Sequence, residues 1–206
     1  MLQMQHRMNT RVHEHWIAQN FEWYRAAWIE CGELMDHVGY KWWKKQTPDM
    51  EQVRLEVVDI WHFGLSALFD AETDLEQLAE QIVADFTSAE MTATESESAV
   101  GRIHEATEAL AQHALASKAF SVPLFAGLMQ ACELSAEGLY RHYVGKNVLN
   151  FFRQDHGYQE GTYVKEWQGR EDNEHLSELL ESLDDGAADF PDQVYQALAS
   201  RYQNVS

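Results

Sequence analysis

The sequence is poor in proline, in cysteine and in positive charge. Its 206 residues include three prolines, two cysteines, and 15 lysines and arginines against 34 aspartates and glutamates, which gives a formal net charge of −19. A protein that binds nucleic acid needs a basic face to meet the phosphate backbone. The charge balance therefore argues against nucleic acid, and equally against an anionic membrane surface, as a partner.

The two cysteines, Cys31 and Cys132, do not have the spacing of a metal or redox motif. We interpret them as reduced thiols of a cytoplasmic protein, although the sequence alone leaves their pairing open. The first ten residues are too polar for the apolar core of a signal peptide. No run of about 18 apolar residues is present that could span a membrane. The expected location is therefore the cytoplasm.

The chain is expected to form a single all-α domain over residues 1–206, because apolar residues recur with helical period and no convincing β-alternation occurs. Thr47 before Pro48 suits a helix start, and capping boxes begin at Thr73 and Thr94. The polar stretch 87–98 is expected to be mobile, within a less defined helical sub-region over 70–135. Helices are expected at about 2–9, 20–38, 48–69, 74–86, 96–118, 123–154, 171–183 and 191–202, with a loop over 155–170.

Two pairs of carboxylates stand on consecutive expected helices. Glu30 and Glu33 are three residues apart, and Glu56 and Asp59 repeat that spacing inside the apolar stretch LEVVDIWHF. Residues at this spacing share one helix face. The connection VGYKWWKKQTPD is short enough to fold the two helices back antiparallel, which would bring the four carboxylates together.

Such a group of carboxylates could be a metal site or an ordinary part of the solvated surface. Acidic pairs on helices usually belong to the solvated surface. Glu56 and Asp59 depart from that pattern, since with Phe63 and Ser66 they form a narrow stripe on a helix otherwise suited to burial. Buried carboxylates are costly unless they are paired, neutralised or bound to a cation. A site made only of oxygen ligands suits Mg²⁺, or Mn²⁺ as a substitute.

The scarce basic residues gather in two segments. Arginine binds phosphate through two parallel hydrogen bonds and lysine binds it as a point charge, so these segments suit a polyphosphate beside a metal site. A glycine-bearing loop after a long helix could close over such a ligand. The alternative is a set of solvated cations beside aromatic residues. One segment holds Lys41, Lys44 and Lys45, and the other holds Arg141, Lys146, Arg153, Lys165 and Arg170.

The first expected helix carries Gln5 and Asn9 four residues apart, with Trp16 just beyond it. Amide side chains can read the edge of a nucleobase, and an indole can stack on its face. Polar residues at this spacing are also common on helix surfaces, so the pattern alone leaves both interpretations open.

At these residues the sequence resembles a known family. ECGE followed by EVVD matches the E-x-x-E…E-x-x-D signature of the MazG-like all-α nucleoside triphosphate pyrophosphohydrolases. GYKWWKK, LEVVDIWHF and YVGKNVLNFFRQDHGYQEGTYVKEWQGREDN more narrowly resemble the dimeric dUTPases. The resemblance covers about residues 1–70 and 138–176.

The resemblance implies an all-α helical bundle that hydrolyses dUTP to dUMP and pyrophosphate by attack on the β-phosphorus, with dUDP as a second substrate. It implies two or three Mg²⁺ ions per site, bound by Glu30, Glu33, Glu56 and Asp59. One glutamate would also activate the attacking water, and Glu33 is taken here as that catalytic residue.

The resemblance also implies residues that bind the nucleotide. Gln5, Asn9 and Trp16 would contact uracil, and Phe63 would pack against the sugar unless it is an ordinary core residue. The N-terminal pattern is altered here, because MQHRMN stands in place of the family's usual form and the segment to Trp16 is short. The phosphate-binding positions would be Lys44, Lys146, Asn150, Arg153, Tyr158 and Lys165.

Several alternatives stay open at this point. The altered N-terminal segment admits a dCTP or broad-range pyrophosphohydrolase of the MazG-like type. Asp59 and His62 have the spacing of a di-iron ligand pair, but that fold needs a second such motif. A non-enzymatic helical dimerisation module would neutralise its carboxylates with lysines. A homodimer is expected in any case, since the aromatic faces around Trp23, Trp28, Trp42 and Trp43 exceed what one helical layer buries.

Overall fold

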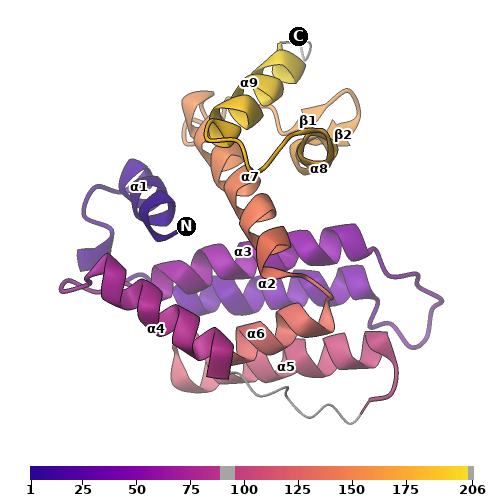
Figure 1. The fold of residues 1–206 in the computed structure, drawn as a ribbon. Helices are drawn as coiled ribbons and strands as arrows, with labels where there is room; N and C mark the ends of the chain where they lie inside the picture. The colour runs from indigo at the N-terminus through magenta and orange to yellow at the C-terminus, as the bar shows by residue number, and fades with distance from the viewer. Residues whose placement is uncertain (89–95, 204–206) are drawn as a thin grey trace. The chain divides into compact units, whose positions relative to one another are not determined.

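The computed structural model describes residues 1–88 and 96–203, and these residues are mostly helical (Figure 1), which confirms the all-α class. Their one sheet is an antiparallel pair of two-residue strands. No helix in the described part is both long and apolar enough to cross a membrane. The elements are α1 (Leu2–Val12), η1 (Ile17–Gln19), α2 (Trp23–Val38), α3 (Met50–Ala67), α4 (Leu75–Ser88), α5 (Ala99–Ser117), α6 (Val122–Ala131), α7 (Ala136–Asp155), β1 (Glu166–Trp167), β2 (Arg170–Glu171), α8 (Asp172–Ser182) and α9 (Phe190–Tyr202).

The chain divides into two compact units. The N-terminal unit comprises residues 2–136, and the C-terminal unit comprises residues 137–206 together with Met1. The expectation of one domain over the whole chain stays a prediction.

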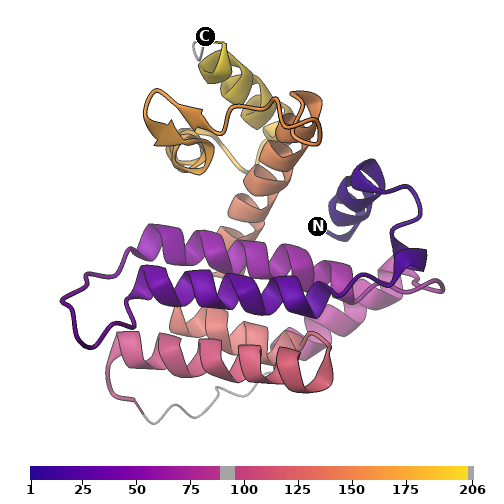
Figure 2. The same cartoon turned by 180° about the vertical axis from the view of Figure 1, so that it is seen from behind.

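Helix α3 is the centre of the N-terminal unit. It lies beside α2 and runs antiparallel to it (Figures 1 and 2), and it also contacts α1 and α6. Helix α5 packs on α2 and α6. Because α3 is covered from several sides, its apolar residues are buried around most of its circumference, which explains why its sequence is apolar between its few polar positions.

An aromatic cluster joins α4 and α6 to α3. Trp61 is fully buried and stacks on Phe125 of α6, with 4.7 Å between the ring centroids. The rings of Phe86 and Phe120 lie at 5.6 and 6.0 Å from Trp61. Phe120 also covers Gly64, where an added Cβ atom would lie 2.4 Å from the Phe120 Cζ atom. Glycine at this position is therefore a packing requirement.

Two helix starts differ from the sequence-based predictions. Helix α3 begins at Met50 and not at Pro48, because the Asp49 side chain accepts a hydrogen bond from the Gln52 amide and caps the helix in place of Thr47. Asp74 precedes α4 and accepts from the amide of Gln77, in place of the predicted Thr73.

The start of α5 is capped by Ser98, which accepts from the Gly101 amide at 3.0 Å. Thr94, where a capping box was predicted, lies outside the described residues, as does most of the stretch 87–98 that was expected to be mobile.

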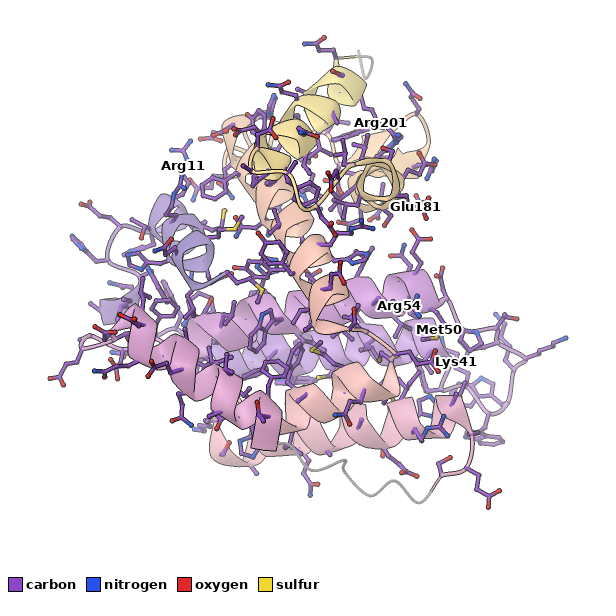
Figure 3. All side chains as sticks on the ribbon, in the orientation of Figure 1. Arg11, Lys41, Met50, Arg54, Glu181 and Arg201 are labelled. Atoms are coloured by element: carbon purple, nitrogen blue, oxygen red, sulfur yellow. The ribbon has the colours of Figure 1, made fainter. Side chains whose placement is uncertain are left out.

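The single helix predicted over 123–154 is wrong, since the structure has α6 and α7 separated by a turn. Glu133 adopts a left-handed conformation (φ 52°), and the Leu134 amide donates back to the Met129 carbonyl at 2.9 Å. Arg54, labelled in Figure 3, donates from Nε to the Cys132 carbonyl at 3.4 Å and helps to hold the end of α6 against α3. The turn contains neither proline nor glycine, so no residue in it signals the end of a helix.

The C-terminal unit is built around Phe152 of α7. Its fully buried ring lies 6.0 Å from the Trp167 ring, 5.3 Å from that of Tyr195 and 5.4 Å from that of Tyr202. These contacts join α7, the hairpin and α9. The predicted loop over 155–170 is confirmed for most of its length, and the short hairpin at its end turns through residues 168 and 169, both with positive φ.

Candidate functional site

Three of the four predicted carboxylates meet in the N-terminal unit. Glu30 and Glu33 of α2 and Glu56 of α3 each place one carboxylate oxygen within 4.8 Å of the others. Glu56 is only 8% exposed, whereas Glu33 is exposed and Glu30 is half-buried. Asp59, one turn further along α3, is half-buried and is not part of this group. The antiparallel pairing predicted from the sequence thus brings the two helices together at their carboxylates.

Carboxylates this close repel one another, and the repulsion is strongest where burial lowers the local dielectric constant. A divalent cation that accepts only oxygen ligands would remove that repulsion, and Mg²⁺ is usually held by one or two carboxylates with its remaining positions filled by water or phosphate. The donor set therefore fits a hard divalent metal.

His37 is a neighbour of this group for which no role was predicted from the sequence. Its Nε2 atom lies 3.6 Å from the Glu56 Oε1 atom, and its side chain is 37% exposed. Glu33 and His37 are four residues apart and therefore lie on one face of α2. Because that face was predicted to meet Glu56, the spacing could have indicated that His37 lies near Glu56 as well.

The loop after α2 carries the first basic segment. Lys41 bonds to Asp36 at 2.5 Å, which lowers the pKa of that carboxyl. Figure 3 labels Lys41 beside Met50, at the end of the pair where the loop joins α2 to α3. Lys44 is exposed, as are Trp42 (91%) and Trp43 (61%).

Gln5 and Asn9 form a buried polar cluster with two residues of α3. The Gln5 Nε2 atom lies 3.0 Å from both the Asn9 Oδ1 atom and the Ser66 hydroxyl oxygen, and the Asn9 Nδ2 atom lies 2.9 Å from the same hydroxyl. The Gln5 Oε1 atom lies 2.9 Å from His62 Nδ1. Gln5 and Asn9 are 4% and 8% exposed, so this pair is an organised buried group rather than solvated helix surface.

Trp16 and Phe63, the aromatic residues predicted to contact the base and the sugar, both pack against Trp23. Trp16 is 2% exposed and packs edge-on against Trp23 and Phe69. It lines a pocket of about 490 Å³ that His6 and Phe69 also line, and neither Gln5 nor Asn9 is among the lining residues. Phe63 is half-buried and stacks on Trp23, with 6.4 Å between the ring centroids. The structure thus gives Trp16 a core position and leaves part of Phe63 accessible.

In the C-terminal unit, Lys146, Asn150 and Arg153 follow one face of α7 at steps of four and three residues. Arg153 binds Asp172 through two parallel hydrogen bonds of 2.8 Å, and its Nη1 atom donates to the Asn150 Oδ1 atom at 3.2 Å. The Lys146 Nζ atom donates to the Asn173 Oδ1 atom at 2.9 Å. The structure brings these three predicted phosphate-binding residues together.

Asp172 organises this cluster from the first turn of α8. Burial of its fully enclosed carboxylate opposes ionisation, yet hydrogen bonds from Arg153 and from the Tyr163 hydroxyl hold its pKa below the ordinary value. Burial and the neighbouring Asp172 raise the pKa of Tyr163 well above its usual range, so Tyr163 remains a donor.

None of Asp172, Asn173 and Tyr163 was predicted from the sequence to have a role. The run EDN carries a signal for a helix start, since acidic residues are favoured in the first turn, but not for the contact with Arg153.

The two further predicted phosphate-binding residues of the C-terminal unit, Tyr158 and Lys165, lie at the edge of this cluster. The Arg153 guanidinium is 6.0 Å from the centre of the exposed Tyr158 ring. Lys165 forms an exposed ion pair with Glu171 at 3.1 Å. A surface pair of this kind contributes little to stability, so the Lys165 ammonium can exchange its partner.

A family model described as dUTPase matches residues 1–158. The chain belongs to the all-α dimeric dUTPase family. It is therefore an enzyme, a dUTP diphosphatase, and the interpretation as a non-enzymatic helical module is wrong. Enzymes of this family generally use a divalent metal, which agrees with the cluster of carboxylates. No curated protein matches the chain.

The matched part of this dUTPase contains the carboxylates, the buried amides and the α7 residues, and it ends at Tyr158. Lys165, Asp172 and Asn173 lie beyond it. The contacts that bind Arg153 to Asp172 therefore join a residue inside the matched range to one outside it.

Proposed function

We propose that this dUTPase uses Mg²⁺ to hydrolyse dUTP to dUMP and pyrophosphate, and that dUDP is a second substrate. The observation that carries the proposal is the convergence of Glu30, Glu33 and Glu56 within 4.8 Å at the contact of two antiparallel helices. Asp59 completes the ligand set from the next turn of α3, and Mn²⁺ can take the place of Mg²⁺.

Glu33 is proposed as the residue that activates the attacking water. It is the exposed member of the group, so water reaches its carboxylate most easily. The water oxygen forms a bond to the β-phosphorus while the bond from that phosphorus to the oxygen bridging the α-phosphate breaks, and Glu33 accepts the proton. The leaving group is dUMP, which keeps the bridging oxygen. The same attack on dUDP gives dUMP and phosphate, which explains why both nucleotides are proposed as substrates.

A divalent ion, when bound, would draw charge from the phosphate oxygens and make the phosphorus more electrophilic. The role of Glu30, Glu56 and Asp59 in this scheme is to hold that ion. Glu56 is largely buried and its Oε1 atom lies 3.6 Å from the His37 ring, so its carboxylate has less freedom to move than those of the other ligands. A fixed first ligand of this kind favours one position for the ion.

The phosphates are proposed to contact Lys44, Lys146, Asn150, Arg153, Tyr158 and Lys165. Arg153 is prepared for this task, because Asp172 holds the Nε–Nη2 edge of its guanidinium and so fixes the plane of the group. The Nη1 side faces Asn150 and can donate to a phosphate oxygen without a change of rotamer. An arginine already held in place loses little side-chain entropy when a ligand binds.

Uracil is proposed to bind at Gln5 and Asn9, with Trp16 supporting that part of the fold from the core. The partly accessible ring of Phe63 is proposed to face the sugar, where its bulk disfavours a 2′-hydroxyl. The support for this assignment is the buried and hydrogen-bonded state of the two amides, which surface residues at the same spacing would not show.

A homodimer is also proposed. Trp42 and Trp43 are 91% and 61% exposed, and Tyr40 beside them is 45% exposed. A contiguous exposed aromatic group of this kind is typical of a surface that binds another protein. Sedimentation should give twice the mass of the 23.8 kDa chain, and Trp42→Ser with Trp43→Ser should shift it toward monomer. Monomeric sedimentation of the unaltered protein at micromolar concentration would contradict the proposal.

The decisive experiment measures pyrophosphate release from dUTP, dCTP, dTTP and UTP, each with Mg²⁺ and with a chelator. A strong preference for dUTP that needs Mg²⁺ supports both the metal and the uracil assignments. Activity spread over several bases keeps the metal site and contradicts the uracil assignment. Equal activity with and without chelator contradicts the metal assignment.

A further inference from the structure

The direction of the hydrogen bonds in the Gln5–Asn9 cluster follows from a single hydroxyl group. The Ser66 hydroxyl oxygen lies 2.9 Å from the His62 main-chain carbonyl, one turn earlier in α3. A carbonyl oxygen can only accept, and a hydroxyl has one hydrogen to donate. The Ser66 hydrogen is therefore committed to the backbone of its own helix, and towards Gln5 and Asn9 the Ser66 oxygen can only accept.

This commitment fixes the orientation of both amides. Gln5 and Asn9 each contact the Ser66 oxygen, so each must turn its NH₂ group, and not its carbonyl oxygen, towards it. The second hydrogen of the Gln5 NH₂ group then points to the Asn9 Oδ1 atom. The Gln5 Oε1 atom is left facing His62 Nδ1, which must carry the hydrogen. A 180° turn of either amide would set two acceptors against each other.

We propose that Ser66 is the residue that sets discrimination between uracil and cytosine, by locking the Gln5 and Asn9 amides in one orientation. This inference rests on the proposed role of Gln5 and Asn9 in base binding. Uracil presents a donor at N3 and an acceptor at position 4, and cytosine presents an acceptor at N3 and a donor at position 4. A 180° turn exchanges the donor and the acceptor of an amide, so a free amide can serve either base and a locked amide only one.

His62 cannot impose this lock without Ser66. An imidazole changes from donor to acceptor at Nδ1 when its hydrogen moves to Nε2, so the ring can follow a turned Gln5 amide. A backbone carbonyl has no such alternative. Ser66 transmits that fixed polarity to two side chains on another helix, which makes it a positioning residue for base recognition.

The test compares Ser66→Ala with a matched control. Thr107→Val removes a buried hydroxyl that bonds to a carbonyl one turn earlier, as Ser66 does, but on α5 and away from the amides. The measured quantity is the ratio of kcat/KM for dUTP to kcat/KM for dCTP. A loss of folded protein affects both substrates equally and cancels in this ratio.

We expect Ser66→Ala to lower the ratio at least tenfold, partly through a gain with dCTP, and Thr107→Val to leave it unchanged. Ser66→Cys keeps the shape of the side chain with a weaker donor and acceptor, so it should give an intermediate ratio. Gln5→Leu tests the underlying assignment and should also lower the ratio.

Each other outcome has one meaning. If Gln5→Leu lowers the ratio and Ser66→Ala does not, the lock is wrong and the base site stands. If Gln5→Leu leaves the ratio unchanged, the proposed base site is wrong and the inference falls with it. An equal drop for Thr107→Val would show a general effect of lost buried hydroxyls and would also overturn the lock.

Discussion

The Nε2 atom of His37, in the last turn of α2, lies 3.6 Å from the Oε1 atom of Glu56 in α3. The Asp49 amide donates to the His37 carbonyl at 3.0 Å, so the residue that caps α3 is tied to the same turn of α2. Two contacts at one histidine thus join α2 and α3 in the alignment that the structure shows. This alignment places the Glu56 carboxylate opposite Glu30 and Glu33.

Glu56→Gln and Asp59→Asn should each reduce pyrophosphate release from dUTP by at least about a hundredfold. Mutation of a residue that only orients a metal ligand typically lowers metal affinity or activity by about 10–100-fold, and the loss of a charged ligand itself should cost at least as much. Helix content measured by circular dichroism should stay nearly unchanged. Glu51→Gln is the control, since Glu51 is exposed in the first turn of the same helix. Near-normal activity of either variant with Mg²⁺ would remove that residue from the proposed site.

Added Mg²⁺ should raise the melting temperature by several degrees relative to chelator at equal ionic strength. A ligand that binds only the folded state at a hundred times its Kd adds about 2.7 kcal/mol of stability. Relief of the repulsion among Glu30, Glu33 and Glu56 adds to the same effect. The double variant Glu30→Gln with Glu33→Gln should melt at the same temperature with and without Mg²⁺. A shift that survives in this variant would locate the metal elsewhere.

Gly64→Ala should destabilise the protein by about 1–3 kcal/mol, because the new methyl group would overlap the Phe120 ring in a closely packed core. Gly32→Ala is the matched control. Gly32 is an exposed residue inside α2 with no atom within 4 Å of an added Cβ, so the change should stabilise the helix by up to about 1 kcal/mol. Chemical denaturation measures both. Equal effects of the two changes would contradict the packing of Phe120 on α3.

The Arg153–Asp172 pair should make stability fall in acid. The pKa of Asp172 is lowered in the folded protein, so the pair stabilises the protein above the ordinary carboxyl pKa of 3.8, and this contribution is lost as the pH falls through the lower folded value. Asp172→Asn leaves a largely buried guanidinium without its charge partner, at a cost of about 3–5 kcal/mol near neutral pH.

Unfolding free energies measured between pH 2 and pH 6 should therefore depend less steeply on pH in Asp172→Asn than in the unaltered protein. Asp192→Asn, an exposed change in the first turn of α9, serves as the control and should keep the original slope. The same slope in Asp172→Asn and the unaltered protein would show that the pair does not govern acid unfolding.

The helices and the meeting of their carboxylates could be predicted because both depend on local spacing. Period 3.6 marks a helix, and steps of three residues place Glu30 with Glu33, and Glu56 with Asp59, on common faces. Antiparallel pairing follows from the short connection. The predicted start of α3 failed for a local reason as well, since Thr47 and Asp49 are both acceptable caps and the sequence does not rank them.

The turn at Glu133 and the contacts of His37 and Asp172 could not be predicted, for different physical reasons. A non-glycine residue in the left-handed region carries no sequence signal of its own. His37 and Asp172 take their roles from residues on other elements, and only the packing of those elements decides which partner each one meets. Ser66 was recognised as part of the polar stripe of α3, but its bond to the His62 carbonyl needed the helix geometry.

The contact of Gly64 with the Phe120 ring also bears on how this sequence can vary over evolution. A larger residue at position 64 would be accepted only in a chain where position 120 had already lost its ring. A smaller residue at position 120 would leave a cavity in the core. Selection would then favour a larger residue at position 64 that fills the cavity. The two positions, 56 residues apart in the sequence, should therefore covary among related chains, with glycine at one accompanying an aromatic residue at the other.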